Sequence, residues 1–298
     1  MNRFSSIGAR PPTPPLETLA PSENGPRESK EPKGTTSDQR TTPRPPSAGR
    51  ASVAGRSSYY YWQTLRPIVC LAFVIPWLLF YETAVLMTDS PSVRGGVDAW
   101  LQWAFDRLGL GPLVILPLVT IVALLVRHHW MHDDWRFDPR VLLGMLVESA
   151  GLGLILYWAA AACHLVLAPQ VMTTEMSEPI SSVLLGPAHA SWVRTVAYVG
   201  SGIYEELVFR LLLFSGLVIW SRRWFSHPHP AWWLAMVVSS SLFAILHFDL
   251  INPAGAPFDW GGFWFRFCAS SIFCAIYLFR GFGIAVGAHV AYDILTQW

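Results

Sequence analysis

Two adjacent glutamates and an arginine interrupt a long apolar stretch of the chain at Glu205, Glu206 and Arg210. A charged side chain at mid-bilayer costs roughly 2.5–3.5 kcal/mol on insertion scales, so such residues usually pair, face inward and serve a function. Residues four apart share one face of a helix, which predicts an ion pair between Glu206 and Arg210. Glu205 points about 140° away from Arg210 on the same helix, so its carboxylate is left to face another element.

Two later apolar stretches carry polar residues at the same helical spacing. One contains Phe243-x-x-x-His247, and the last contains His289-x-x-x-Asp293, which places His289 and Asp293 on one helix face. A carboxylate can take a proton from water, and imidazoles can orient that water or stabilise developing charge. The three motifs therefore predict a hydrolytic site built from three helices.

In their order and spacing, these motifs resemble those of the CAAX-processing and bacteriocin-processing family (CPBP, or Abi) of intramembrane proteases. The family pattern is EExxxR, then FxxxH, then HxxxN or HxxxD, and the resemblance covers about residues 192–298. It implies an intramembrane endopeptidase of the CAAX type. It further implies that Glu205 is the general base for an attacking water and that His247 positions this water.

The same resemblance assigns the remaining motif residues. Glu206 and Arg210 form a supporting pair, and His289 with residue 293 stabilises the tetrahedral oxyanion. Many family members have Asn at the last position, whereas this chain has Asp293. Because an ionised carboxylate would repel an oxyanion, three roles are open for Asp293. It is protonated, or it orients and charges His289, or a metal lies among the four groups.

Three other functions compete with a glutamate-activated water. A zinc metalloprotease would use Glu205, His247 and His289 as ligands, although the sequence has no local HExxH motif. The resemblance itself implies no cofactor. Intramembrane Glu, His and Arg residues also mark transport pathways, and a non-catalytic immunity protein could retain the fold.

The composition predicts an all-α, polytopic membrane protein. Of the 298 residues 52% are hydrophobic, and apolar stretches near the length of about 20 residues that crosses a bilayer recur after Ser58. We expect about seven transmembrane helices (six to eight), near residues 65–87, 111–127, 141–168, 192–220, 231–248, 263–280 and 282–297. A tight turn at Arg280-Gly281-Phe282-Gly283 joins the last two.

The first 58 residues differ in composition from the rest. They contain ten of the 23 prolines, many Ser and Thr residues and few large apolar ones. Such a segment cannot bury enough surface to offset its ordering entropy, so we expect a disordered tail over 1–58 and a transmembrane domain over 59–298. Within that domain, 97–108 is expected to form a short amphipathic helix at the interface.

The charges of the loops predict how the chain is oriented in the membrane. The tail and the loops 128–140 and 221–230 carry most of the basic residues, whereas 169–190 and 249–262 contain acids and no Lys or Arg. By the positive-inside rule the N-terminus is cytoplasmic, and we expect the plasma (inner) membrane as the location. The expected partners are membrane lipids and a membrane-anchored or lipidated peptide or protein substrate. The chain lacks the basic face of nucleic-acid-binding proteins.

One further histidine pair has metal-binding spacing. His128 and His132 are four residues apart and are followed by acidic residues. Because they lie in a loop between two apolar stretches, we interpret them as residues of a hydrated interfacial loop.

Overall fold

The computed structural model describes residues 53–88, 115–167, 187–225, 227–248 and 256–296. Over these ranges the backbone is helical, and its only extended pairing is a single bridge between Phe248 and Ala256. The all-α prediction is therefore confirmed. The helices are α1 (Val53–Thr64), α2 (Pro67–Thr88), α4 (Ile115–Met131), α5 (Arg140–Leu167), α7 (Pro187–Glu206), the π-helix η3 (Leu207–Phe214), α8 (Ser215–Ser221), α9 (Pro228–Leu246), α10 (Trp260–Arg280) and α11 (Phe282–Leu295).

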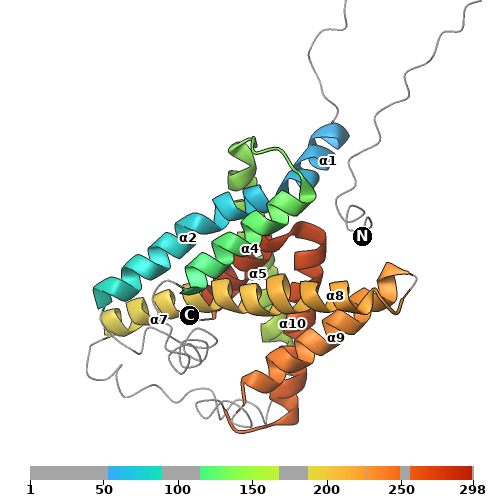
Figure 1. Ribbon diagram of the computed structural model, residues 1–298. Helices are drawn as coiled ribbons and strands as arrows, with labels where there is room; N and C mark the ends of the chain where they lie inside the picture. Colours follow the sequence, from blue (N-terminus) through green and yellow to red (C-terminus); the bar gives the residue numbers. More distant parts are fainter. Residues whose placement is uncertain (1–52, 89–114, 168–186, 226, 249–255, 297–298) are drawn as a thin grey trace, which may run out of the picture. The chain divides into compact units, whose positions relative to one another are not determined.

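A helix or a continuous run of helices occupies each of the seven expected spans. Four described helices, α2, α5, α9 and α10, have the length and the apolar composition needed to cross a membrane, and α4 and α11 are shorter apolar helices. The segments α7, η3 and α8 follow one another without a break, as a single long rod (Figure 1). This rod carries the charged motif in its middle. The chain is thus a polytopic helical membrane protein.

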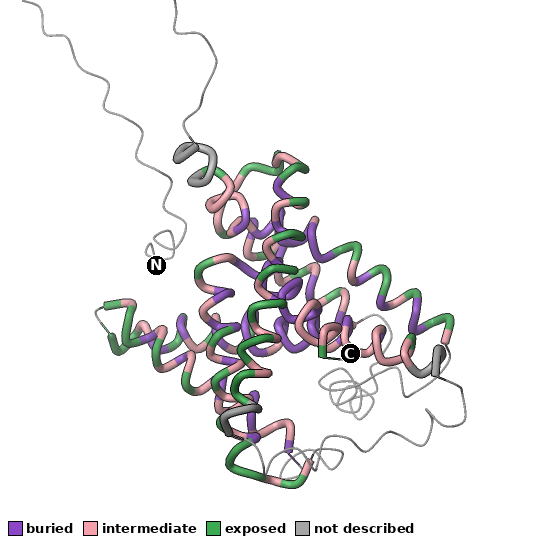
Figure 2. The backbone as a smooth tube through the Cα atoms, turned by 180° about the vertical axis from the view of Figure 1, so that it is seen from behind, coloured by how far each residue is buried: buried purple, intermediate pink, exposed green. Residues whose placement is uncertain are grey.

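Helix α11 lies at the centre of the helices from Tyr59 onward and contacts α5, α7, α2 and α10. Nine consecutive residues of α11, from Phe282 to Val290, are buried. Figure 2 shows that buried positions gather where helices meet, while exposed positions follow their outer sides. The burial of α11 matters because its second half carries His289 and Asp293.

Glycines allow α11 to approach its neighbours closely. A Cβ atom on Gly153 of α5 would lie 2.6 Å from the Cβ of Ala291, and one on Gly202 of α7 would lie 2.5 Å from Val290 Cγ2. Both contacts are shorter than any that real side chains tolerate. Small residues at such contacts are typical of helix packing in membranes, and here they fix the distance from α11 to the charged rod.

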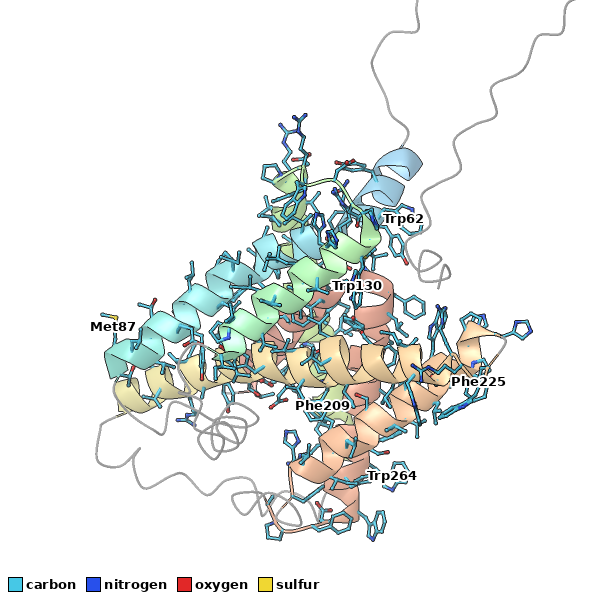
Figure 3. The ribbon with its side chains drawn as sticks, in the orientation of Figure 1. Trp62, Met87, Trp130, Phe209, Phe225 and Trp264 are labelled. Atoms are coloured by element: carbon cyan, nitrogen blue, oxygen red, sulfur yellow. The ribbon has the colours of Figure 1, made fainter. Side chains whose placement is uncertain are left out.

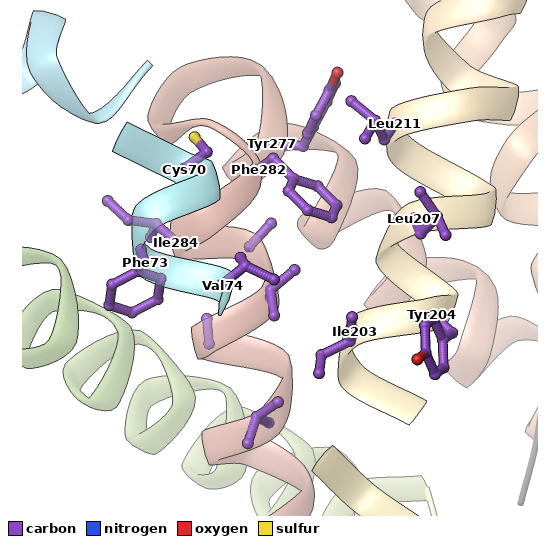
Figure 4. Packing of buried hydrophobic residues seen from close by; sticks show 14 of the residues in the cluster. Cys70, Phe73, Val74, Ile203, Tyr204, Leu207, Leu211, Tyr277, Phe282 and Ile284 are labelled. Carbon is purple, nitrogen blue, oxygen red and sulfur yellow. The ribbon is translucent and has the colours of Figure 1, made fainter. Parts of the chain in front are cut away.

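The rod is held by an apolar row on its inner side. Tyr204, Leu207 and Leu211 follow one another along this side, facing the core that also contains Tyr277 and Phe282 (Figure 4). All five side chains are buried. This apolar row fixes the rotation of the rod about its axis, and so decides where the neighbouring charges point.

Contacts with α1 and α5 hold the turn between α10 and α11 in place. Gly281 has a φ of 86°, and a Cβ there would lie 2.6 Å from the carbonyl oxygen of Thr64. Next to it, Arg280 donates two hydrogen bonds of 2.5 and 2.7 Å to Glu148, which also accepts one of 2.7 Å from the Tyr60 hydroxyl. Burial and the Glu148 carboxylate raise the pKa of Tyr60. These contacts join α1, α5 and the start of α11.

Some sequence-based expectations lie outside the described residues, and one is wrong. The proposed amphipathic helix at 97–108 and residues 1–52 of the tail lie outside the described residues, and α1 begins at Val53, within the segment expected to be disordered. The hydrated-loop interpretation of His128 is wrong. Helix α4 continues to Met131, so His128 lies in its last turn and is buried against Trp135. The side chain of Trp130, in the same turn, is exposed (Figure 3).

Candidate active site

Glu205 is a buried carboxylate faced by two imidazoles from other helices. Its Oε1 lies 3.8 Å from His247 Nε2, and its Oε2 lies 3.7 Å from His289 Nε2. Oε1 also accepts a hydrogen bond of 2.6 Å from the Ser201 hydroxyl, one turn earlier on α7. The side chain left unpaired in the sequence motif thus points to the two histidines of the other motifs.

Glu206, unlike Glu205, is paired with an arginine. Its Oε1 lies 3.2 Å from Arg210 Nη1, and neither side chain is exposed. The predicted ion pair is therefore present. The same oxygen lies 2.8 Å from His289 Nδ1, so Glu206 contacts both the arginine and the imidazole. Its other oxygen is buried and has no hydrogen-bond partner among the described residues.

Arg210 is enclosed by α9 and α10. Its Nη2 donates to the hydroxyl and the carbonyl oxygen of Ser270, at 3.2 and 3.4 Å. Its guanidinium carbon lies 4.9 Å from the centroid of the Phe243 ring and 5.4 Å from that of Phe273. Cation–π contacts of this kind are strengthened when the cation is desolvated. The Phe of the FxxxH motif therefore contacts the arginine of the first motif.

The π-helix η3 begins directly after Glu206 and contains Arg210. In a π-helix each N–H bonds to the carbonyl five residues earlier, and such segments are rare and frequent at functional sites. Here the backbone N–H and the hydroxyl of Ser215 both donate to the Arg210 carbonyl oxygen, the hydroxyl at 3.2 Å. The backbone therefore changes from α-helical to π-helical pitch between Glu206 and Arg210.

His247 ends α9 as its C-cap, and its side chain is 28% exposed. Its Nδ1 lies 2.7 Å from the Phe243 carbonyl oxygen, which leaves Nε2 directed to Glu205. Its own carbonyl oxygen accepts a hydrogen bond from the Ala256 N–H. Among Glu205, His247, His289 and Asp293, the side chain of His247 is the most exposed, so this group of residues is most accessible on its side.

His289 is buried and surrounded by carboxyl groups. Its ring stacks on Phe273, with centroids 4.5 Å apart. Nδ1 contacts Glu206, while Nε2 lies 3.6 Å from Asp293 Oδ2 and 3.7 Å from Glu205. The predicted pair on one face of α11 is thus brought to the same point as Glu205.

A catalytic zinc ion would need three of these donors to converge on one point. No group of three His, Cys, Asp or Glu side chains in the described parts of the chain has an arrangement that could hold a metal ion. The Nδ1 atoms of both histidines are engaged, one by Glu206 and the other by the backbone. Metal-bound histidines usually have their other ring nitrogen engaged in this way, so the Nε2 atoms that face Glu205 are the nitrogens that a zinc ion would use.

Residues 187–295 match the family model for the type II CAAX prenyl endopeptidase Rce1-like proteins. Over these residues the chain is similar to the Rce1-like proteins. The match confirms the resemblance inferred from the three motifs, and it covers all seven motif residues discussed above. It indicates a membrane protease of the CAAX type, a hydrolase of peptide bonds. No match was found among curated proteins or solved structures.

Sequence reasoning missed several neighbours of the Rce1-like motifs. Ser201 lies between two glycines and was not among the predicted site residues, yet its hydroxyl contacts Glu205. Its spacing of four residues before Glu205 was the available signal. Ser270 and Phe273 contact Arg210 and His289 from α10, and nothing in the spacing along the chain relates them to those residues.

Proposed function

We propose that this protein is an intramembrane endopeptidase that hydrolyses a peptide bond of a membrane-associated protein or peptide with a water activated by Glu205. The observation that carries the proposal is the asymmetry of the glutamate pair. Glu206 is held by Arg210, whereas Glu205 faces the Nε2 atoms of His247 and His289. A buried carboxylate between two imidazoles is suited to general-base chemistry.

The attacking water is held between Glu205 Oε1 and His247 Nε2. These atoms are 3.8 Å apart, a separation that one water can bridge with two hydrogen bonds of about 2.8 Å. Glu205 takes one proton from the water while its oxygen bonds to the carbonyl carbon of the substrate. When the carbon–nitrogen bond breaks, Glu205 returns that proton to the leaving amine. The products are a carboxylic acid and an amine, so one water is consumed.

His289 stabilises the oxyanion formed in this attack. A protonated imidazole donates from both nitrogens, so Nδ1–H is held by Glu206 while Nε2–H is available to the oxyanion. Of the three roles open for Asp293, its distance of 3.6 Å from His289 Nε2 favours the one in which the carboxylate orients and charges His289. At this distance the Asp293 carboxylate favours the charged form of the imidazole by its negative charge, without a direct hydrogen bond to Nε2.

The substrate is a membrane-anchored or lipidated protein or peptide. The family model is named for prenyl endopeptidases, and helices long and apolar enough to span a bilayer surround the site. Membrane lipids are then the other partner. We place the N-terminus in the cytoplasm and the protein in the plasma (inner) membrane, on the basis of its loop charges.

Comparing the membrane proteins of cells that make the wild type or Glu205→Gln tests this proposal. We expect at least one cleavage product to disappear in the variant while the amount of inserted enzyme stays the same. Ser271→Ala is the control, because the hydrogen bonds of its hydroxyl go to the Phe267 carbonyl oxygen and the Ser240 hydroxyl, neither of which belongs to a motif residue. We expect this control to process normally.

Two results would contradict the proposal. Unchanged products with Glu205→Gln would leave a transporter or a non-catalytic protein as the better account. Loss of wild-type processing on chelation, restored by zinc, would favour the metalloprotease.

A further inference from the structure

Ser201 is placed to hold the proposed base. Its hydroxyl donates to Glu205 Oε1 at 2.6 Å, within the range of short hydrogen bonds to ionised oxygens. Hydroxyls within helices often bond the carbonyl four residues earlier. Thr195 on the same helix does so, with 2.9 Å to the Ser191 carbonyl oxygen. Ser201 points the other way along the helix, to the side chain four residues later.

This hydrogen bond makes the two oxygens of Glu205 different. Oε1 accepts from Ser201 and faces His247, and Oε2 faces His289. The terminal torsion of a glutamate is broad, so a carboxylate without such a bond would rotate freely between orientations. The orientation in which Ser201 holds the carboxylate presents one oxygen to each histidine.

The backbone around Ser201 is confined on both sides. A Cβ on Gly200 would lie 2.3 Å from the Tyr81 ring of α2, and one on Gly202 would lie 2.5 Å from Val290 of α11. The backbone at Ser201 is therefore held between two packed helices, which fixes the point from which its side chain extends. A rigid support of this kind is what a reacting group needs to stay in a productive geometry.

We infer that Ser201 is a positioning residue, whose hydroxyl fixes the Glu205 carboxylate so that Oε1 faces the water site at His247 and Oε2 faces His289. The inference rests on the proposed function, because it concerns the same hydrolysis. It assigns Ser201 no bond to the substrate. The competing role is that of a nucleophile. Glu205 then takes the hydroxyl proton, Ser201 Oγ bonds the substrate acyl carbon as the carbon–nitrogen bond breaks, and the proton passes to the leaving amine. Water later cleaves the resulting ester to the acid and the free hydroxyl.

Steady-state kinetics of the purified protein separate these roles. The substrate is a fluorogenic peptide spanning a cleavage site found in the processing comparison. We expect Ser201→Ala to lower kcat by about 10- to 100-fold with little change in KM, because a misplacement of about 1 Å costs up to about 10²-fold. Ser201→Thr keeps the hydroxyl and should restore kcat to within about threefold. Ser271→Ala, which removes a hydroxyl that bonds Phe267 and Ser240 and not Glu205, should match the wild type.

Several outcomes would overturn the inference. One is a wild-type kcat for Ser201→Ala. Another is complete loss of turnover in Ser201→Ala together with labelling of Ser201 by a fluorophosphonate, which would make it the nucleophile. If Ser201→Ala does not fold, Ser201→Cys gives the same comparison with a weak donor of similar size. In that case a wild-type kcat for Ser201→Cys would likewise overturn the inference.

Glu205→Gln, measured in the same series, separates this inference from the proposed function. An inactive Glu205→Gln beside a fully active Ser201→Ala refutes only the role of Ser201. An active Glu205→Gln refutes the proposed function itself.

Discussion

Glu205 and Glu206 are neighbours in the chain but have different surroundings. Glu206 is bound to a buried guanidinium and to His289, at 3.2 and 2.8 Å. Glu205 accepts a hydrogen bond of 2.6 Å from the Ser201 hydroxyl and lies 3.8 and 3.7 Å from two imidazoles. Neutralising Glu206 would leave the charge of Arg210 buried without its partner. Breaking a buried ion pair is strongly destabilising, whereas losing a charge that is not ion-paired to a guanidinium costs less.

Thermal unfolding in detergent should therefore separate the two glutamates. We expect Glu206→Gln and Arg210→Ala to lower the free energy of unfolding by about 3–5 kcal/mol. Glu205→Gln should stay within about 1 kcal/mol of the wild type. Equal stabilities for all three variants would show that the supporting role has been assigned to the wrong pair.

Asp293 is the motif residue that departs from the common Asn. If it acts through His289, an amide should replace part of its function by orienting the ring. We expect Asp293→Asn to keep kcat within about tenfold of the wild type and Asp293→Ala to lower it by about 10²-fold, the scale of a lost oxyanion donor. The measurement is peptide hydrolysis over a range of pH. An Asn variant as impaired as the Ala variant would require a carboxyl group at this position.

At the scale of the elements, close packing of α11 brings His289 and Asp293 to the rod. Gly153 and Gly151 of α5 provide a matched pair. A Cβ on Gly153 meets Ala291 at 2.6 Å and the backbone N of Tyr292 at 3.0 Å, whereas one on Gly151 meets nothing within 4 Å. Alanine at either position improves helix propensity by roughly 0.5–1 kcal/mol, so only Gly153→Ala must displace α11.

We therefore expect Gly153→Ala to lower kcat by about tenfold or more, because the shift moves His289 relative to Glu205. Gly151→Ala should be as active as the wild type and at least as stable. Peptide hydrolysis and thermal unfolding of both variants give the answer. Equal activity would mean that α11 adapts without moving the site.

The helices and the motifs were predictable from the sequence for physical reasons. Long apolar stretches give membrane helices, and the i, i+4 spacing gives the Glu206–Arg210 pair. The π-helix after Glu206 and the contact of Ser270 with Arg210 were not predictable, because they depend on packing between segments far apart in sequence. His128 was misplaced because the end of α4 was drawn about one turn too early, at 127 and not at Met131.

For the whole molecule, the open question is which side of the membrane the site faces. His247 follows a helix that starts after Arg222 and Arg223, so the loop charges predict that it lies toward the non-cytoplasmic side. A labelling reagent can test this prediction at an exposed position near His247. Phe248 is buried and unsuitable, whereas Trp260, at the start of α10, is 66% exposed.

Labelling a single cysteine at Trp260 with an impermeant thiol reagent tests this orientation. The background must lack the four native cysteines, since Cys163 and Cys268 are exposed. We expect labelling from the non-cytoplasmic side of intact cells. Labelling only after the cytoplasmic face is opened would reverse the orientation and place the entrance to the site in the cytoplasm.

The central claim is that Glu205 activates water without a metal ion. Its most direct test is the rate of peptide hydrolysis by the purified protein, measured for the wild type and Glu205→Gln, each before and after chelation. We predict an unchanged wild-type rate after chelation and a loss of about 10²–10⁴-fold in Glu205→Gln, with the same melting temperature. Hydrolysis by Glu205→Gln at the wild-type rate, or a wild-type rate that falls on chelation and returns with zinc, would contradict it.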